Sequence, residues 1–212
     1  MKIPDQPAAT EKPKGRPRSF DRDKALLKAL DLFWRKGFEP ASVAELCAAM
    51  EINPPSLYSA FGNKAQLFLE AVNYYETKYW QATWLRLEER HDIGEAIDGF
   101  FSEAADILLS PSAPCGCMVV LAAINVSAES TDVVRAVSVL RQEGKDLFKK
   151  RLVRAVQEKQ LPADTNTVAL ATVLNTLLEG MSIEAKDGTT LQSLKLIGQH
   201  ATRLLHPLTI RN

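Results

Sequence analysis

Two cysteines separated by a single residue have the spacing in this sequence that most directly suggests chemistry. Cys115 and Cys117 form a Cys-x-Cys pair close to an expected helix start. A thiol pKa can fall there, and such a pair can sense electrophiles or bind a soft metal. The histidines His91, His200 and His206 are scattered along the chain, and no acidic ligands accompany the pair. We therefore expect no metal or other cofactor, and two interpretations stay open: a thiol sensor, or Cys117 as small apolar filler.

A basic segment near the N-terminus is the second feature with a chemical meaning. The stretch "KPKGRPR" at 12–18 carries four positive charges and no negative one. Residues 1–64 hold 11 Lys/Arg and 8 Asp/Glu, a net of +3, which leaves 15 against 18, a net of −3, for the remainder. A basic arm on a mildly acidic protein permits binding to nucleic acid. Because residues 1–18 contain four prolines and few large apolar side chains, we expect a disordered arm.

Several function classes lack support in this sequence. No Ser/His/Asp, paired-carboxylate or phosphate-loop constellation is present, so we expect no enzyme. No apolar run approaches the roughly 20 residues that span a bilayer, and the N-terminus has no apolar signal core. Three cysteines are too few for a disulfide scaffold. These features predict a cytoplasmic protein with no membrane partner.

The elements that position these residues are helices. Asp21 can cap a first helix that Gly37 closes. A short second helix at 42–50 follows, in which Ser42 and Glu45 have the spacing of a capping box. Apolar residues recur at helical spacing along the rest of the chain, and no convincing strand or repeat is found. The sequence predicts an all-α fold with about nine helices.

Two consecutive prolines begin the third helix instead of ending one. With Asn53 as N-cap, Pro54 and Pro55 occupy the first turn, where the N–H groups have no partner inside the helix. The Asn53 side chain can still accept a hydrogen bond from the N–H of Ser56. This predicts a helix over 54–61, three residues behind the second helix. Two short helices so joined are typical of a helix-turn-helix, whose second helix enters the DNA major groove.

Longer helical segments follow, and they divide the chain. We expect helices over about 64–90, 92–109, 132–160, 165–186 and 190–205, with a strongly apolar stretch at 117–128. The expected domains are a basic arm (1–18), a helix-turn-helix DNA-binding domain (19–66), and a ligand-binding and dimerisation domain (67–212).

Residues 16–69 resemble the TetR family of transcriptional repressors. The matching motifs are "FWRKGF" (33–38), the helix that Ser42 starts, and "SLYSAFGNKAQLF" (56–68). The family shows Thr/Ser-Leu-Tyr-x-x-Phe-x-x-Lys-x-x-Leu at the last of these. Two positions depart from the pattern: Glu51 stands where the turn commonly has glycine, and Ala65 where glutamate is common. A turn that needs positive φ would place a small strain on Glu51.

The resemblance implies different roles in DNA binding for different residues. Tyr58 and Lys64 would hold phosphates, which supply most of the affinity. Ser42, at a helix N-terminus, can place its hydroxyl and backbone N–H groups on another phosphate. Arg16 and Arg18 resemble arms that enter a narrow A·T-rich minor groove. Base edges would be read by exposed side chains of the third helix, namely Asn53, Pro55, Ser56 and Ser59. These lack the bidentate donors of arginine, so we expect modest direct readout and some indirect readout.

The resemblance also implies an effector cavity and a homodimer in the second domain. We expect apolar cavity walls from Trp80, Trp84, Phe100 and Phe101, and a few polar or thiol groups from Cys117, Asn125, Asn175 and Glu179. Dimerisation brings two recognition helices to half-sites about 34–36 Å apart or a multiple of that. Its expected stripes are Leu170, Leu174, Leu177, Leu178 and Met181 on one helix, and Leu191, Leu194, Ile197, Ala201 and Leu204 on the next.

These features together predict a ligand-responsive homodimeric repressor. It would bind a palindromic double-stranded operator and leave it when a small-molecule effector binds. Two alternatives stay open at this point: a redox or electrophile sensor using Cys115 and Cys117, and an activator or ligand-independent DNA-binding protein that shares the same reading helices.

Overall fold

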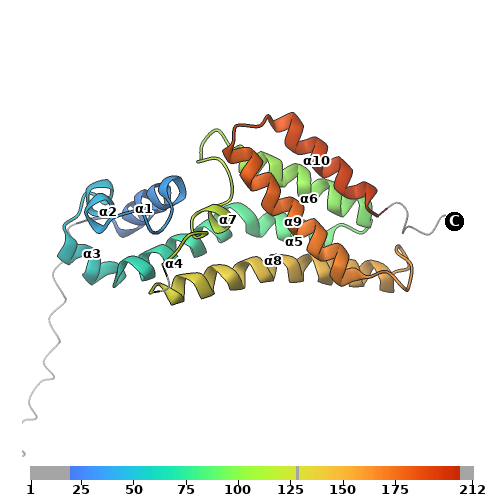
Figure 1. The fold of residues 1–212 in the computed structure, drawn as a ribbon, viewed down its shortest axis with the longest axis horizontal. Coiled ribbons are helices and arrows are strands. Elements are labelled where there is room, and N and C mark those ends of the chain that lie inside the picture. Colours follow the sequence, from blue (N-terminus) through green and yellow to red (C-terminus); the bar gives the residue numbers. More distant parts are fainter. Residues whose placement is uncertain (1–19, 128, 206–212) are drawn as a thin grey trace, which may run out of the picture.

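The computed structural model describes residues 20–127 and 129–205 as an elongated assembly of helices (Figure 1). In chain order the elements are α1 (Arg22–Lys36), α2 (Val43–Met50), α3 (Pro54–Phe61), α4 (Lys64–Tyr75), the π-helix η1 (Glu76–Trp80), α5 (Gln81–Glu89), α6 (Ile93–Leu108), α7 (Met118–Leu121), α8 (Thr131–Gln157), α9 (Thr167–Lys186) and α10 (Leu191–Arg203). The described residues contain no strand. The all-α prediction is confirmed, and α4, η1 and α5 follow one another without a break, where a single helix was expected.

The N-terminal head, residues 20–63, is built by the local signals that the sequence predicted. Asp21 accepts hydrogen bonds from the N–H groups of the first turn of α1, and Gly37, with φ of 87°, ends that helix. Ser42 and Glu45 form the expected capping box at the start of α2. Arg22 bonds both carboxylate oxygens of Glu70 and so ties α1 to α4.

The proline pair occupies the position that its chemistry predicted. Asn53 caps α3 and accepts from the N–H of Ser56 at 2.9 Å, while Pro54 and Pro55 fill the first turn. Glu51, in the turn before them, has φ of 58° and ψ of 39°, the left-handed conformation that glycine adopts most easily. The strain expected at Glu51 is therefore present.

One difference from the sequence-based expectation is the π-helix inside the long rod that begins at Lys64. The chain adopts π geometry over Glu76–Trp80 and then returns to an α-helix. Beside this segment Trp80 Nε1 donates to the hydroxyl of Tyr75 at 2.7 Å, and both side chains are buried. π segments are rare and are frequent at functional sites.

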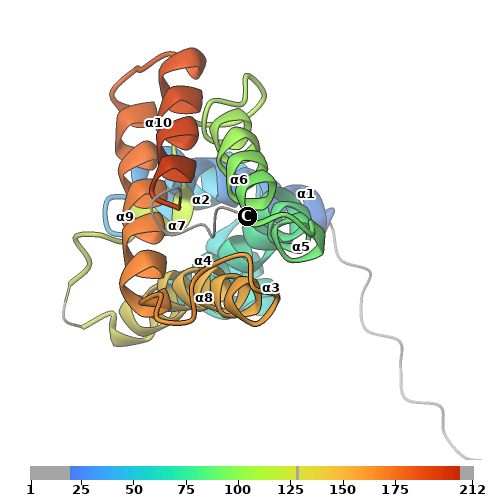
Figure 2. The same cartoon turned by 90° about the vertical axis from the view of Figure 1, so that its right-hand side faces the viewer.

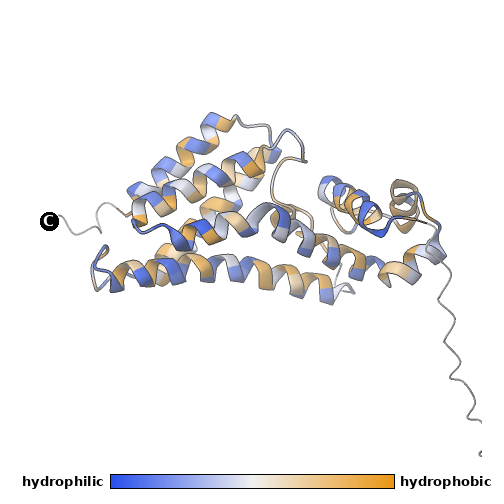
Figure 3. Cartoon of the chain, turned by 180° about the vertical axis from the view of Figure 1, so that it is seen from behind, coloured by the Kyte–Doolittle hydropathy of each residue, from blue (hydrophilic) through white to orange (hydrophobic). Residues whose placement is uncertain are grey.

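The body, residues 64–205, is a bundle around an aromatic core. Figure 2 shows α9 and α10 together on one side, α5 and α6 on the other, and α8 below. In Figure 3 polar and apolar positions alternate along α8 and α10, so each turns one face to the bundle and the other outward. The apolar stretch at 117–128 yields only the short α7, because the chain bends after Leu121.

The helix α9 corrects one expectation. It is long and apolar enough to cross a membrane by length and composition, whereas no such run was expected. It packs against α8, α10 and α6, and it buries Leu174 and Met181 inside the bundle. These contacts bury one face of α9 in the bundle, while Val173 and Ile183 on the same helix are exposed.

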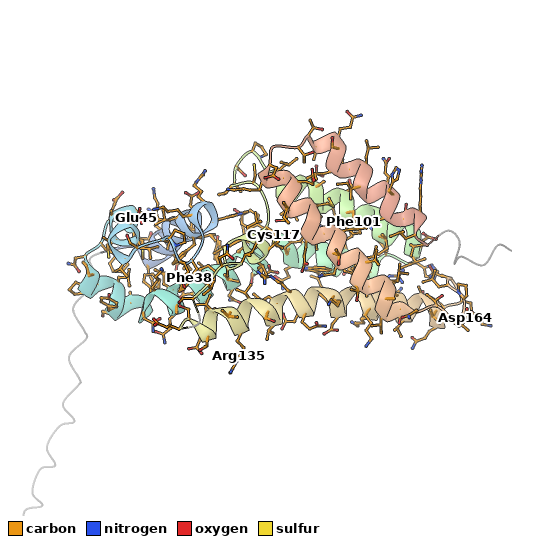
Figure 4. All side chains as sticks on the ribbon, in the orientation of Figure 1. Phe38, Glu45, Phe101, Cys117, Arg135 and Asp164 are labelled. Atoms are coloured by element: carbon orange, nitrogen blue, oxygen red, sulfur yellow. The ribbon has the colours of Figure 1, made fainter. Side chains whose placement is uncertain are left out.

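Head and body are joined by a second connection besides α4. We call residues 116–122 the junction segment. Trp34 Nε1 in α1 donates to the carbonyl of Gly116 at 2.8 Å, and the N–H of Phe38 donates to the carbonyl of Ala122 at 2.7 Å. On the other side, Ser182 Oγ in α9 accepts from the N–H of Cys117 at 2.7 Å. Figure 4 places Cys117 between Phe38 of the head and Phe101 of the body along the long axis.

Candidate nucleic-acid interface and ligand cavity

The outer face of α3 presents most of the side chains predicted to meet DNA. Tyr58 is 51% exposed, and Pro55 and Ser59 are exposed beside it. The opposite face holds Leu57 and Phe61, which are buried in the head. A phenol so exposed on a short helix contributes little to the core, so the exposure favours the DNA-contact interpretation of Tyr58 over simple packing.

Three further residues predicted to contact DNA are less available for it, because their side chains bond within the head or are partly buried. Ser42 is exposed, but its hydroxyl already accepts from the N–H of Glu45 and donates to that carboxylate at 2.9 Å. The side-chain oxygen of Asn53 caps α3, so its amide NH₂ remains as the free donor. Ser56 is half-buried, which makes it the least accessible of the four predicted base-reading positions.

Lys64 is less free than the sequence suggested. Its ammonium donates to the carbonyl of Glu39 at 3.1 Å and lies 4.4 Å from the centre of the Phe38 ring. Burial lowers the pKa of Lys64, while the charge of Glu39 acts in the opposite direction. An ammonium has three N–H donors, so a phosphate can still bind to those that Glu39 does not use. Arg16 and Arg18 lie outside the described residues, and their minor-groove role stays a prediction.

Replacing Lys64 with alanine should weaken DNA binding by a similar factor on every sequence and lower the slope of log affinity against log salt by about 1. The measurement is fluorescence anisotropy on duplexes over a range of salt concentrations. Lys149→Ala is the control, since it removes one exposed charge from α8 in the body. An unchanged slope in Lys64→Ala would remove this residue from the phosphate contacts.

A cavity of about 460 Å³ opens in the body beside the π-helix. Its lining includes five side chains predicted from the sequence: Trp80, Trp84, Cys117, Asn175 and Glu179. They come from η1, α5, the junction segment and α9. The site therefore lies where the rod that starts in the head meets the bundle.

Three predicted ligand residues lie elsewhere. Phe100 and Phe101 are fully buried behind Trp84, in a cluster with Phe148, and do not line the cavity. Asn125 is exposed in the connection between α7 and α8 and also does not line it. The apolar stretch around Asn125 suggested a buried amide, but the chain has left the helix before reaching it.

Several acidic groups of the cavity were not predicted from the sequence. Glu76 from η1, Glu143 from α8 and Glu88 from α5 line it together with Arg141. Glu76 interrupts the aromatic run "NYYETKYW" (73–80), a carboxylate among rings, and this signal was available. Glu143 lies on a helix with many exposed charges, and its place in the cavity depends on tertiary packing.

The two spaced cysteines have different surroundings. Cys115 is exposed, whereas Cys117 is buried and lines the cavity. Burial raises the pKa of the Cys117 thiol to about 11, with the nearby Glu76 acting in the same direction. A thiolate is the reactive form, so Cys117 is poorly suited to electrophile sensing. The described residues also hold no group of three or more His, Cys, Asp or Glu fit to bind a metal.

Comparison with known proteins identifies the family. Residues 25–71 match "Bacterial regulatory proteins, tetR family", and residues 95–195 match "Tetracyclin repressor-like, C-terminal domain". The HTH-type transcriptional repressor ComR of Escherichia coli (strain K12) is 30% identical over 201 residues, which are 94% of this chain and 96% of ComR. The chain belongs to the TetR family. BdcR of the same organism, also an HTH-type transcriptional repressor, is 31% identical over 180 residues, or 85% of this chain and 86% of BdcR.

Solved structures place the fold in the same TetR family. The TetR family transcriptional regulator CifR, solved as a cysteine mutant with 26-bp operator DNA, is 41% identical, with a TM-score of 0.85 over 89% of this chain and 98% of CifR. The reduced form of NemR from E. coli is 20% identical with a TM-score of 0.72, and here the likeness is of fold alone. This chain is thus a helix-turn-helix, DNA-binding transcription regulator.

Proposed function

We propose that this TetR-family protein is a cytoplasmic, homodimeric repressor that binds a palindromic operator and is released when a small molecule occupies the cavity beside η1. One observation carries the proposal. The rod α4–η1–α5 begins at Lys64, next to α3, and its η1 segment lines the cavity with Glu76 and Trp80. A ligand that changes η1 therefore acts on the same rod that carries the recognition helix.

The physical mechanism is a difference in affinity between two states. Ligand binds the state whose two recognition helices are wrongly spaced for the operator, and operator binds the other state. The two ligands then oppose each other through a reciprocal coupling free energy, typically about 1–3 kcal/mol. The junction segment supports the same coupling, because it lines the cavity with Cys117 and Val119 and bonds α1 through Gly116.

The homodimer needs a face on α9 and α10 that the protomer leaves open. Most of the predicted stripe is used inside the protomer, since Leu170, Leu174, Leu178, Met181, Leu194 and Ala201 are buried there. Exposed apolar side chains remain on α9, on α10 and directly after α10: Val168, Val173, Ile183, Leu191, Leu196 and Leu204. A second copy of the chain covering these residues would remove apolar area from water, which favours association.

The cavity favours a ligand-responsive repressor over an architectural DNA-binding protein. The experiment is selection of fragments of the source genome on the purified protein, followed by footprinting and by competition with candidate ligands. We expect a palindromic site whose half-sites lie about 34–36 Å apart or a multiple of that, and loss of the complex with a cavity ligand. If no fragment is enriched at low ionic strength, the DNA-binding proposal is wrong; if no ligand changes binding, the protein is not ligand-responsive.

A further inference from the structure

The walls of the cavity beside η1 are suited to an apolar molecule. Trp80 and Trp84 lie on one side, with ring centres 6.4 Å apart. The remaining apolar lining residues include Leu85, Val119, Val120, Leu140, Leu147 and Leu178. Gly144 in α8 keeps space open, because a side chain there would begin 3.3 Å from Asn175 Oδ1 and 3.5 Å from the Trp84 ring.

The charges of the cavity are unbalanced. Four carboxylates line it, from Glu76, Glu88, Glu143 and Glu179, against two cationic groups. Lys150 is paired with Glu88 at 3.3 Å.

The second cationic group, Arg141, is also engaged. It donates to the backbone carbonyls of Val119 at 3.0 Å and Val120 at 3.2 Å. Within residues 20–127 and 129–205, Glu76, Glu143 and Glu179 form no ion pair, and only Glu179 has a side-chain donor, the amide of Asn175 at 3.0 Å. Three carboxylates thus line the cavity without an ion-pair partner among the described residues: Glu76 and Glu179 are half-buried and Glu143 is exposed. Arg141 keeps its charge, so the lining carries four negative groups against two positive ones.

This arrangement changes the pKa of Glu76. Burial, and then the charge of Glu143, raise the pKa of the Glu76 carboxyl to about 7. A carboxylate desolvated beside another one is stabilised when a cation enters between them. An anionic ligand would add to the repulsion, and a neutral apolar ligand would cover the carboxylates without pairing them.

We propose that the cavity binds an organic cation with an apolar body, its charge held by Glu76, Glu143 and Glu179 and its body lying against Trp80 and Trp84. The faces of tryptophan rings attract cations and so add to the carboxylates. This assignment of a ligand class rests on the proposed role of the cavity as the effector site.

Binding is coupled to the protonation of Glu76. The other titratable groups that line the cavity are Glu143, Arg141 and Lys150 of α8, Glu179 of α9, Glu88 of α5 and Cys117 of the junction segment. Below pH 7 the Glu76 carboxyl is mostly protonated and neutral, so a cation binds it poorly; above pH 7 it is charged. Affinity for a cation therefore rises from pH 6 to pH 8, and binding near pH 7 releases a proton.

The test uses two probes of the same shape and opposite charge, tetraphenylphosphonium and tetraphenylborate. Each is titrated into the full chain at pH 8, with tryptophan fluorescence and calorimetry as readouts. We expect saturable binding of the phosphonium and at least about tenfold weaker binding of the borate. Glu76→Gln and Glu143→Gln should each weaken phosphonium binding about tenfold, and Glu76→Gln should also remove its dependence on pH.

Glu184→Gln is the matched control, since Glu184 is exposed on α9 outside the cavity and loses the same charge. The affinity of Glu184→Gln for tetraphenylphosphonium should equal that of the wild type. Absence of phosphonium binding, equal binding of the two ions, or equal effects of the control and the cavity variants would each overturn the proposal. Anisotropy of operator DNA is measured in parallel. Phosphonium that binds the cavity without releasing DNA supports the ligand class and contradicts the effector role.

Discussion

Gly116→Ala is expected to lower the free energy of unfolding by about 3 kcal/mol. Gly116 has φ of 82°, a conformation that costs energy for any residue with a side chain. A methyl group there would also lie 2.8 Å from the carbonyl oxygen of Ser182 and overlap the side chain of Leu121. The neighbouring backbone of α9 cannot move aside easily. The loss is measured by urea denaturation followed by circular dichroism at fixed protein concentration.

Gly188→Ala is the control that separates backbone strain from crowding. Gly188 has φ of 90°, yet nothing lies within 4 Å of a methyl group at that position. The free energy of unfolding of Gly188→Ala should fall by only about 1 kcal/mol, because only the backbone strain is added. Equal losses of unfolding free energy in the two variants would mean that the junction segment has room for the added methyl group beside the carbonyl of Ser182.

Phe100→Ala is expected to cost about 3–5 kcal/mol, the usual range for removing a buried phenylalanine. Phe100 is fully buried, and its ring centre lies 4.4 Å from that of Trp84 and 4.9 Å from that of Phe148. Its loss leaves a hole behind Trp84, one wall of the proposed ligand cavity. We therefore expect altered ligand affinity in addition to the loss of stability.

The measurement is again urea denaturation, with Leu27→Ala as the control. Leu27 in α1 is 43% exposed, so its truncation should change stability by less than about 0.5 kcal/mol. A loss below about 1 kcal/mol in Phe100→Ala would show that the site collapses around the missing ring. The interpretation of Phe100 as core packing would then be wrong.

The helix starts and caps of the head could be predicted residue by residue, because the signals that specify them are local. Asn53, Pro54 and Pro55 specify a helix start through bonds that span three residues, and Ser42 with Glu45 does the same. Such signals act through hydrogen bonds between near neighbours, and no tertiary information is needed. The exposure of Tyr58 then follows from the face that Leu57 and Phe61 bury.

The cavity could be predicted only in part, because it joins four separate elements. The sequence predicts Trp80 and Trp84 as wall residues, but nothing in it separates them from Phe100, which packs behind them. Helical periodicity shows that a face is buried without showing against what. The π-helix likewise could not be predicted from a pattern of 3.6 residues per turn.

The junction segment limits how the head can move. The head is held by α4, by the bonds from Trp34 and Phe38 to the carbonyls of Gly116 and Ala122, and by Glu39, whose carboxylate accepts from the N–H of Ser127 at 2.7 Å. A head attached at several separated points cannot slide or twist freely against the rest of the chain. A displacement of the recognition helix on ligand binding therefore has few directions open to it, and it must change these bonds together with α4.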